Sequence, residues 1–208
     1  MTGDLDTTEV IDSILPALHT DTRANLYFWT EADLIQWMDE ALKRLARKAC
    51  VFVERSTALN SVKGQAVYNL PDAHEATLHV SYISTPLRAA GTIELEGRNP
   101  QYQTAPGTPD HWYEGLQGDY TIGVTPVPVE NGDAIPLICA VYPPDLDTAK
   151  VNTLVTAPYP LKGYLEMSVL AAAYGREGES EMQDLAQHCR SRADMYEQMF
   201  AQYYGKAV

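Results

Sequence analysis

The sequence predicts an α+β fold in which helices from both ends of the chain pack as one bundle and a β-rich segment lies between them. Apolar residues recur at steps of three and four near both ends of the 208-residue chain, whereas they alternate with polar residues in the middle. Grouped helices and strands favour this class over alternating βαβ units. We therefore expect a helical domain of residues 1–55 and 158–208 and a β-rich domain of residues 56–157, built as a small antiparallel sheet, sandwich or barrel.

Both helices expected near the N-terminus have start signals. Asp6, with a glutamate three residues later, can cap a first helix that Pro16 and the polar residues 19–25 end. Thr30 followed by Asp33 forms an acidic variant of the capping box and starts the next helix. This amphipathic helix is expected over about residues 31–54, with apolar positions at Leu34, Met38, Ala41, Leu42, Leu45, Ala49 and Phe52.

The middle of the chain has a period of two, with turn signals between its strands. Lys63-Gly64 separates two runs that resemble a hairpin, and the Asn131-Gly132 pair suits a primed hairpin turn. Residues 91–119 are rich in Gly, Pro and Asn, so we expect a surface loop there with a short helical turn near residues 93–96. The expected strands are residues 57–61, 65–70, 77–82, 120–124 and 134–141.

Two further helices are expected in the C-terminal quarter. The first should begin at Pro160 and stop at Gly175, and Ser180 with Gln183 offers a capping box for the second. The end of the second helix is apolar over a wide arc, which packs against the 31–54 helix, forms a docking face for a partner, or does both. This candidate interface consists of Met195, Tyr196, Met199, Phe200, Tyr203 and Tyr204.

Composition and charge exclude several classes of protein. The 28 acidic and 15 basic residues give a net charge of −13, which argues against binding to nucleic-acid phosphates. The chain shows neither an apolar run long enough to span a membrane nor a secretion signal, so we expect a soluble protein. Cys50, Cys139 and Cys189 are scattered, which favours a reducing cytoplasm over a disulfide framework or zinc knuckle. The 13 tyrosines against 3 phenylalanines suit either solvated sheet faces or protein interfaces.

Catalytic and metal-binding motifs are not apparent. The sequence contains no GxSxG, GxxxxGK[ST] or GxGxxG motif, and its five histidines show no HxxxH or HExxH spacing. We therefore expect no catalytic, cofactor or metal site. The nearest carboxylate pairs are Glu94 with Glu96, Asp110 with Glu114, and Asp145 with Asp147. A less favoured alternative is a glycan-binding or wall-degrading module in which Asp110 or Glu114 acts as the acid and sugars stack on Tyr102, Trp112, Tyr113 and Tyr120.

Several short segments suggest a family when they are taken together and in order. They are FWTEADLIQWMDEAL at residues 28–42, YNLPD at 68–72, GTPDHWY at 107–113, VTPVP at 124–128 and YPPDL at 142–146. This order resembles that of the head-to-tail adaptor, or connector, proteins of tailed bacteriophages, including the tail tubular protein A type. Each segment alone is degenerate, so the shared order carries the resemblance.

The resemblance implies a structural protein of the virion neck, made in the host cytoplasm, without enzymatic activity or cofactor and without contact to a membrane. Such proteins form a ring, most often of twelve copies, beneath the portal protein and extend the DNA channel to the downstream tail or nozzle protein. Twelve copies would carry a charge of about −156, and a wall of that sign repels phosphates, so that DNA passes through without specific binding. By analogy, the tail at residues 202–208 is a candidate for a segment that orders on docking. Another neck or tail component, such as a tail terminator, is the alternative within the virion.

Overall fold

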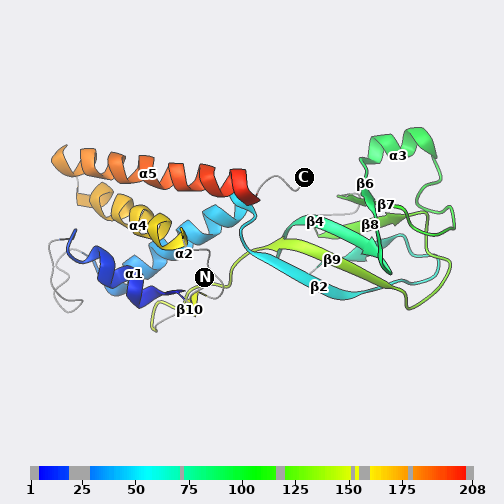
Figure 1. Ribbon diagram of the computed structural model, residues 1–208, viewed down its shortest axis with the longest axis horizontal. Helices are drawn as coiled ribbons and strands as arrows, with labels where there is room; N and C mark the ends of the chain where they lie inside the picture. The colour runs from blue at the N-terminus through cyan, green and yellow to red at the C-terminus, as the bar shows by residue number, and fades with distance from the viewer. Residues whose placement is uncertain are drawn as a thin grey trace. The chain divides into compact units, whose positions relative to one another are not determined.

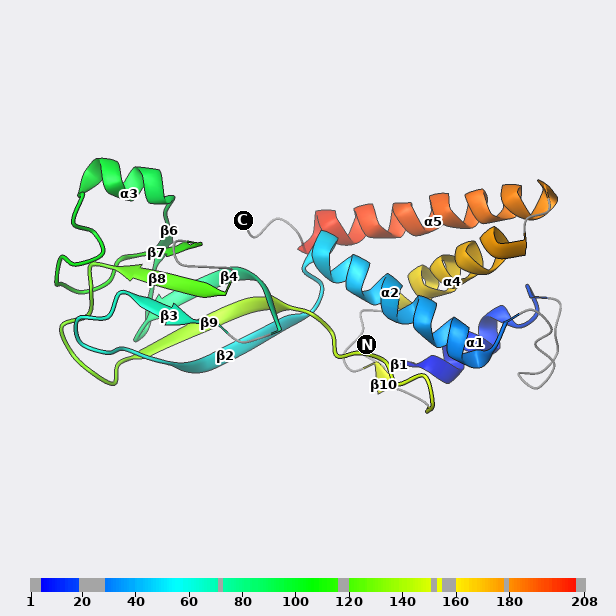
Figure 2. The ribbon, with the colours of Figure 1, turned by 180° about the vertical axis from the view of Figure 1, so that it is seen from behind.

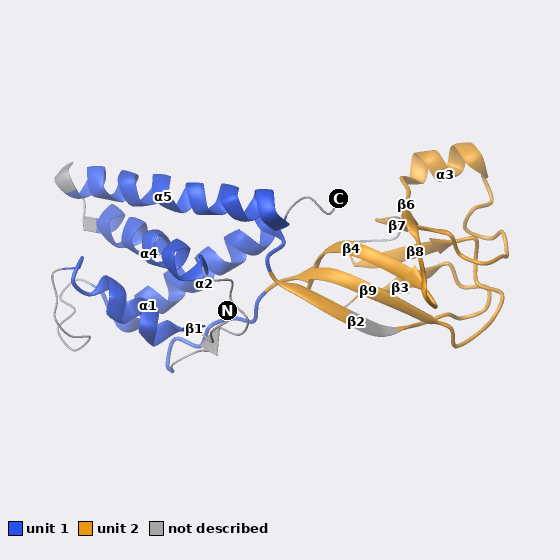
Figure 3. Cartoon of the chain, in the orientation of Figure 1, with its two compact units in different colours: residues 1–51, 143–206 blue, residues 52–142, 207–208 orange. Residues whose placement is uncertain are grey.

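The chain folds into two compact units, which the two colours in Figure 3 distinguish. The computed structural model describes residues 5–18, 29–70, 73–115, 120–150, 153–154, 160–177 and 180–204. The helical unit comprises Met1–Val51 and Pro143–Lys206, and the β unit comprises Phe52–Tyr142. The predicted α+β class, with helices toward both ends and a β-rich middle, is confirmed.

The elements of each unit follow in chain order. The helical unit contains β1 (Leu5–Asp6), α1 (Thr7–Ile14), α2 (Glu31–Ala49), β10 (Thr153–Leu154), α4 (Leu161–Glu177) and α5 (Ser180–Tyr204). The β unit contains β2 (Val53–Asn60), β3 (Val67–Asn69), β4 (His74–Tyr82), β5 (Thr85–Pro86), β6 (Arg88–Ala89), α3 (Thr92–Arg98), β7 (His111–Glu114), β8 (Thr121–Thr125) and β9 (Ala134–Val141).

The predicted start signals of α1 and α2 are confirmed. The carboxylate of Asp6 accepts a hydrogen bond from the backbone N–H of Glu9 at 2.8 Å. At the start of α2, the Thr30 hydroxyl accepts from the backbone N–H of Asp33, and the Asp33 carboxylate accepts from the backbone N–H of Thr30. Each helix therefore satisfies first-turn amides with side chains close in sequence.

Two predicted helix ends are wrong. The helix α2 ends at Ala49 and not near residue 54, because Cys50 adopts the left-handed conformation, with φ of 48°, and β2 begins at Val53. The helix α4 continues past Gly175 to Glu177. Glycine permits a helix to end but does not force it to do so. The predicted capping box at Ser180 lies outside the described side chains.

The helices α1, α2, α4 and α5 lie side by side in the helical unit (Figure 1), and their buried residues are mostly apolar. The helix α2 buries one continuous face, as its predicted spacing requires. The helix α4 contacts α1, α2 and α5, and its inward residues are completely buried. Side chains with no exposed surface on α2 are Leu34, Met38, Ala41, Leu45 and Ala49, and those on α4 are Leu161, Tyr164, Leu165, Val169 and Ala173.

A buried carboxylate joins three of these helices. Glu197 of α5 is only 3% exposed, and its Oε2 lies 2.5 Å from Nζ of Lys48 on α2. Its Oε1 lies 3.5 Å from Nε of Arg44, also on α2. The Tyr164 hydroxyl of α4 lies 3.0 Å from both Oε1 of Glu197 and the carbonyl oxygen of Ala41. Burial raises the pKa of Tyr164, and the Glu197 charge raises it further, so the hydroxyl keeps its proton for this contact.

The β unit consists of two four-stranded sheets with the strand orders β2-β9-β4-β5 and β3-β8-β7-β6 (Figure 2). All neighbouring strands are antiparallel except β6 and β7, which are parallel. Side chains from both sheets form one buried cluster, so the sheets pack face to face. The cluster consists of Tyr68, Leu70, Val80, Tyr82, Leu87, Ile122, Val124, Ile135, Leu137 and Cys139.

Neither predicted hairpin forms. The Lys63-Gly64 turn connects β2 to β3, and the Asn131-Gly132 turn connects β8 to β9, but in each case the two strands belong to different sheets. The turn chemistry itself is present, since Gly64 and Gly132 have φ of 79° and 87°. A period-two pattern predicts where a strand lies but not which strand it pairs with. Here the burial of side chains between two sheets selects pairing strands that are far apart in sequence.

Residues 91–119 contain more structure than the predicted loop. The expected helical turn near residues 93–96 is present as the longer helix α3. The strand β7 was not predicted; it pairs with β8 from His111↔Thr125 to Glu114↔Ile122. On the α3 side of this sheet, Leu95, Tyr102 and Tyr113 form a second, smaller buried cluster.

Gly123 on β8 allows Tyr113 to lie flat against the sheet. A Cβ at Gly123 would lie 2.1 Å from two ring carbons of Tyr113, whose ring is almost completely buried and cannot retreat. We expect Gly123→Ala to destabilise the β unit by about 1–3 kcal/mol through overpacking. Urea unfolding and hydrogen exchange of the β7 and β8 amides measure this effect. Gly97→Ala in α3, where nothing lies within 4 Å of the new Cβ, should leave stability unchanged or slightly higher.

Removal of the Glu197 carboxylate should loosen the contacts among α2, α4 and α5. We expect Glu197→Ala to cost about 2–4 kcal/mol, because it leaves a cavity and removes the buried acceptor of two cations and a hydroxyl. Urea unfolding followed by helical circular dichroism measures the loss. The control is Asp194→Ala on the exposed side of α5, with an expected change within about 0.5 kcal/mol. Equal effects of the two substitutions would contradict the assigned role of Glu197.

Candidate functional site: an apolar face on the last helix

The structure divides the six residues of the predicted interface into two groups. Phe200 is buried, and its ring contacts Tyr164 of α4 edge to face at a centroid distance of 6.4 Å. Tyr196 is half-buried, and its hydroxyl lies over Gly163 of α4. Tyr204 is half-buried and stacks on the Phe200 ring. These three residues therefore belong to the packing of the helical unit.

The other three residues form an exposed row along α5, which we call the α5 row. Met195, Met199 and Tyr203 follow one another at steps of four residues and so lie on one side of the helix. Met195 is 60% exposed and Tyr203 is 81% exposed. Methionine and tyrosine are enriched in protein interfaces, because they combine adaptable apolar surface with a polar edge. Of the predicted interface, only the α5 row presents large apolar side chains to solvent.

The α5 row borders a hollow, which we call the α5 hollow. It has a volume of about 260 Å³ and is lined by Pro160, Met199, Phe200, Tyr203 and Tyr204. The Tyr203 and Tyr204 rings meet edge to face at 4.9 Å between their centroids. The lining is chiefly aromatic and aliphatic. Such a site has the chemistry to accept an apolar side chain of a protein partner.

A charged group lies one helical turn from Phe200, which lines the α5 hollow. Arg44 and Lys48 are about half exposed and both pair with Glu197, three residues before Phe200 on α5. Two cations against one carboxylate give this group a net positive charge, in a chain whose overall charge is −13. Sequence inspection missed this arrangement because the three residues come from opposite ends of the chain.

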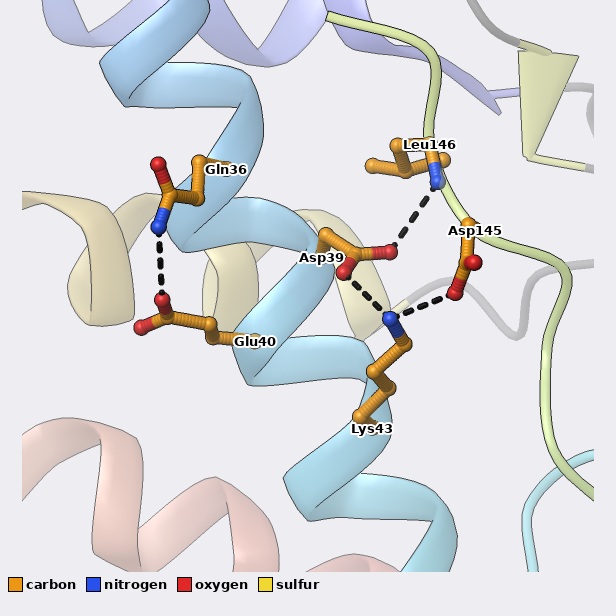
Figure 4. Close-up of polar contacts among 6 residues, drawn as sticks. All are labelled: Gln36, Asp39, Glu40, Lys43, Asp145 and Leu146. Atoms are coloured by element: carbon orange, nitrogen blue, oxygen red, sulfur yellow. Dashed lines mark hydrogen bonds and ion pairs between the residues drawn. The ribbon is translucent and has the colours of Figure 1, made fainter.

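A second polar cluster fastens the chain where it returns to the helical unit (Figure 4). Lys43 of α2 lies 2.7 Å from Asp39 and 2.5 Å from Asp145. Asp39 also accepts the backbone N–H of Leu146 at 3.0 Å. The hydrogen bond to Asp145, followed by that to Asp39, raises the pKa of Lys43 and keeps it charged. Asp145 therefore contacts the ammonium group of Lys43, which supports a structural role for this carboxylate.

The remaining carboxylate pairs do not form catalytic arrangements. Glu94 pairs with Arg98 within α3, and Asp147 accepts the backbone N–H of Ala149, which lowers its pKa. The Asp110 carboxylate lies 2.7 Å from Nδ1 of His111, whereas the Glu114 carboxylate accepts the backbone N–H of Thr77, so each has a different neighbour.

The proposed sugar-stacking aromatics are also largely unsuited to that role. Tyr102 and Tyr113 are buried in the smaller cluster of the β unit, and burial raises the pKa of Tyr113 to about 12. Trp112 is half-buried and Tyr120 is exposed, so these four residues do not make one exposed platform.

A shallow cleft of about 330 Å³ in the β unit includes Leu70, His74, Glu75, Glu114 and Tyr120. His74 lies 2.9 Å from the Thr77 hydroxyl and 3.7 Å from Glu114, and burial lowers its pKa, which keeps it neutral. Glu114 accepts the backbone N–H of Thr77, so this carboxylate helps to hold β7 beside β4.

The described residues contain no group of three potential metal ligands. Within the described part of the chain, no helix is long and apolar enough to cross a bilayer.

Comparison with known proteins agrees with a structural role. A search of curated proteins finds no match. The family model described as "SU10 adaptor protein" matches residues 6–207, nearly the whole chain and both units. The expected resemblance to bacteriophage adaptors is thereby confirmed at the level of the family, and the tail tubular protein A type is not singled out by this match. The chain belongs to the SU10 adaptor protein family, a family of phage head-to-tail adaptors.

Proposed function

We propose that this adaptor forms a ring beneath the portal protein and extends the DNA channel toward the tail. The family match over residues 6–207 carries this proposal, because it covers both units and not a single shared motif. The partners are the portal protein, a downstream tail or nozzle protein, and neighbouring copies of the chain, most simply twelve in all. Its place is the virion neck, between capsid and tail.

The exposed α5 row supports a role in assembly. Three large apolar side chains in line on one helix expose surface that the described residues of the helical unit leave uncovered. Contact with a neighbouring copy or with the portal would remove that surface from water. Tyr203, Met199 and Met195 are therefore our proposed contact residues, with Phe200, Tyr196 and Tyr204 as their support.

The charge of the chain supports a channel through which DNA slides. A charge of −13 per copy gives a ring of twelve about −156, which disfavours adhesion of phosphates to the wall. The contacts of the candidate acids support a structural role over catalysis, since Asp145, Asp147, Glu94 and Glu114 each hold a neighbouring backbone or side-chain group.

The copy number in virus particles tests the proposed function. Quantitative mass spectrometry of purified particles from the source of this gene should find the chain and the portal protein at a ratio near one. Such a ratio is expected because each portal subunit would face one adaptor subunit. Absence of the chain from complete particles would refute the adaptor ring.

The α5 row should be needed for assembly but not for folding. We expect Met195→Glu to fold with unchanged thermal stability, because the side chain is largely exposed, and to lower the copies per particle roughly tenfold or more. Gln198→Glu adds the same charge elsewhere on the exposed surface of α5 and serves as the control. Comparable incorporation of both variants would show that the α5 row is not a contact surface.

A further inference from the structure

Ile83, in the turn between β4 and β5, combines two unfavourable features. Its backbone has a φ of 58°, in the left-handed region that β-branched residues rarely adopt. Its side chain is nonetheless 57% exposed, so the strain is not offset by burial in the core of the β unit. Glycine or asparagine would fit this turn without the strain. Strain of this kind points to a functional constraint on the residue.

Ile83 belongs to an apolar end of the β unit, which we call the β tip and define as Val62, Ile83 and Val129. Val62 and Val129 are also exposed. Their loops are connected through the start of β9, where Ser61 donates its N–H to the carbonyl oxygen of Asp133 at 2.7 Å and Ile83 donates to that of Ala134 at 2.8 Å.

Further hydrogen bonds hold the β tip in one shape. The backbone N–H of Lys63 donates to Oδ1 of Asn131 at 2.8 Å, and the Ser61 hydroxyl donates to the carbonyl oxygen of Glu130 at 3.0 Å. The Tyr82 hydroxyl donates to the Asp133 carboxylate. A prearranged apolar projection loses little conformational entropy when it enters a pocket.

The charges around the β tip complement those around the α5 hollow. Glu130, Asp133 and Lys63 lie in the loops of the β tip and give it a net negative charge. Arg44 and Lys48 with Glu197 form a group of net positive charge one helical turn from Phe200 in the lining of the α5 hollow. Each surface has an apolar centre, a branched aliphatic side chain on one and an aromatic hollow of about 260 Å³ on the other.

We propose that the β tip of one copy docks in the α5 hollow of a second copy, with Ile83 inserted among Pro160, Met199 and Tyr203. The two surfaces differ, so the contact is heterologous, and repeated heterologous contacts form a ring when the rotation between neighbouring copies closes. This inference rests on the proposed ring and names the surfaces that join its subunits. The exposed Ile83 side chain then gains burial between copies that it lacks within one.

Photo-cross-linking in assembled particles tests the contact directly. A benzophenone amino acid at position 83 should give, on irradiation, a species of twice the 23.0 kDa chain mass, with the cross-link at Pro160 or within residues 199–204. The proposal would be overturned by a cross-link to another protein, to a different part of this chain, or within one chain. It would also be overturned if particles that contain the chain gave no cross-link. The same probe at Ile93, 86% exposed on α3, is the control and should not label residues 199–204.

The test separates this inference from the proposed function. A copy ratio near one with no cross-link between position 83 and the α5 hollow would keep the ring and reject this contact. If particles lack the chain, the proposed function fails, and irradiation of the concentrated full-length chain decides whether the two surfaces meet. The same cross-linked dimer would support the contact, and its absence would reject it.

Substitution of Ile83 distinguishes an interface residue from a folding residue. We expect Ile83→Asn to raise or maintain the melting temperature, since asparagine tolerates the left-handed conformation, and to lower the incorporation into particles roughly tenfold. Ile93→Asn should change neither quantity. Normal incorporation of Ile83→Asn, or a loss of incorporation that follows a loss of stability, would contradict the proposal.

Discussion

The buried carboxylate of Glu197 is the interaction on which the helical unit most depends. It accepts contacts from Lys48 and Arg44 of α2 and from Tyr164 of α4, so that one side chain near the C-terminus connects helices from both ends of the chain. A buried charge is tolerated only when it is paired and hydrogen-bonded. Its partners therefore fix how α5 lies on α2 and α4, and with it the side of α5 that carries the exposed α5 row.

The chain leaves the helical unit after α2 and returns to it at Pro143. Cys50 ends α2 in the left-handed conformation, and Lys43 with Asp39 holds the returning chain at Asp145 and Leu146. The contact between Asp39 and Leu146 joins residues separated by 107 positions. The β unit is an insertion between α2 and this returning segment, and its own residues supply its core.

Within the β unit, the residues that form the core differ from the exposed Ile83, for which we propose a role in assembly. The face-to-face core of the two sheets is closed and apolar, and Gly123 leaves room for the Tyr113 ring in the smaller cluster behind it. Of the acidic residues in its candidate pairs, Glu114 holds β7 beside β4 and Glu94 pairs with Arg98 within α3. What the core does not explain is the strained and exposed Ile83. An adaptor must present rigid surfaces to several neighbours, and a sheet scaffold with short fixed loops is suited to that purpose.

The sequence by itself determined the starts of α1 and α2, the amphipathic face of α2 and the positions of several strands, because each depends on residues close together along the chain. It also determined the adaptor resemblance, because the order of short segments can be compared without any tertiary contact. The Thr30–Asp33 capping box, for example, needs three residues of separation and no tertiary contact. Only the tertiary structure decided the strand partners, the existence of β7, the burial of Glu197 and the division of the α5 residues into packed and exposed groups. A period of two or 3.6 shows which side of an element is apolar, but it does not reveal what covers that side. That choice comes from burial between segments far apart in sequence, where one-dimensional patterns carry no information about distance.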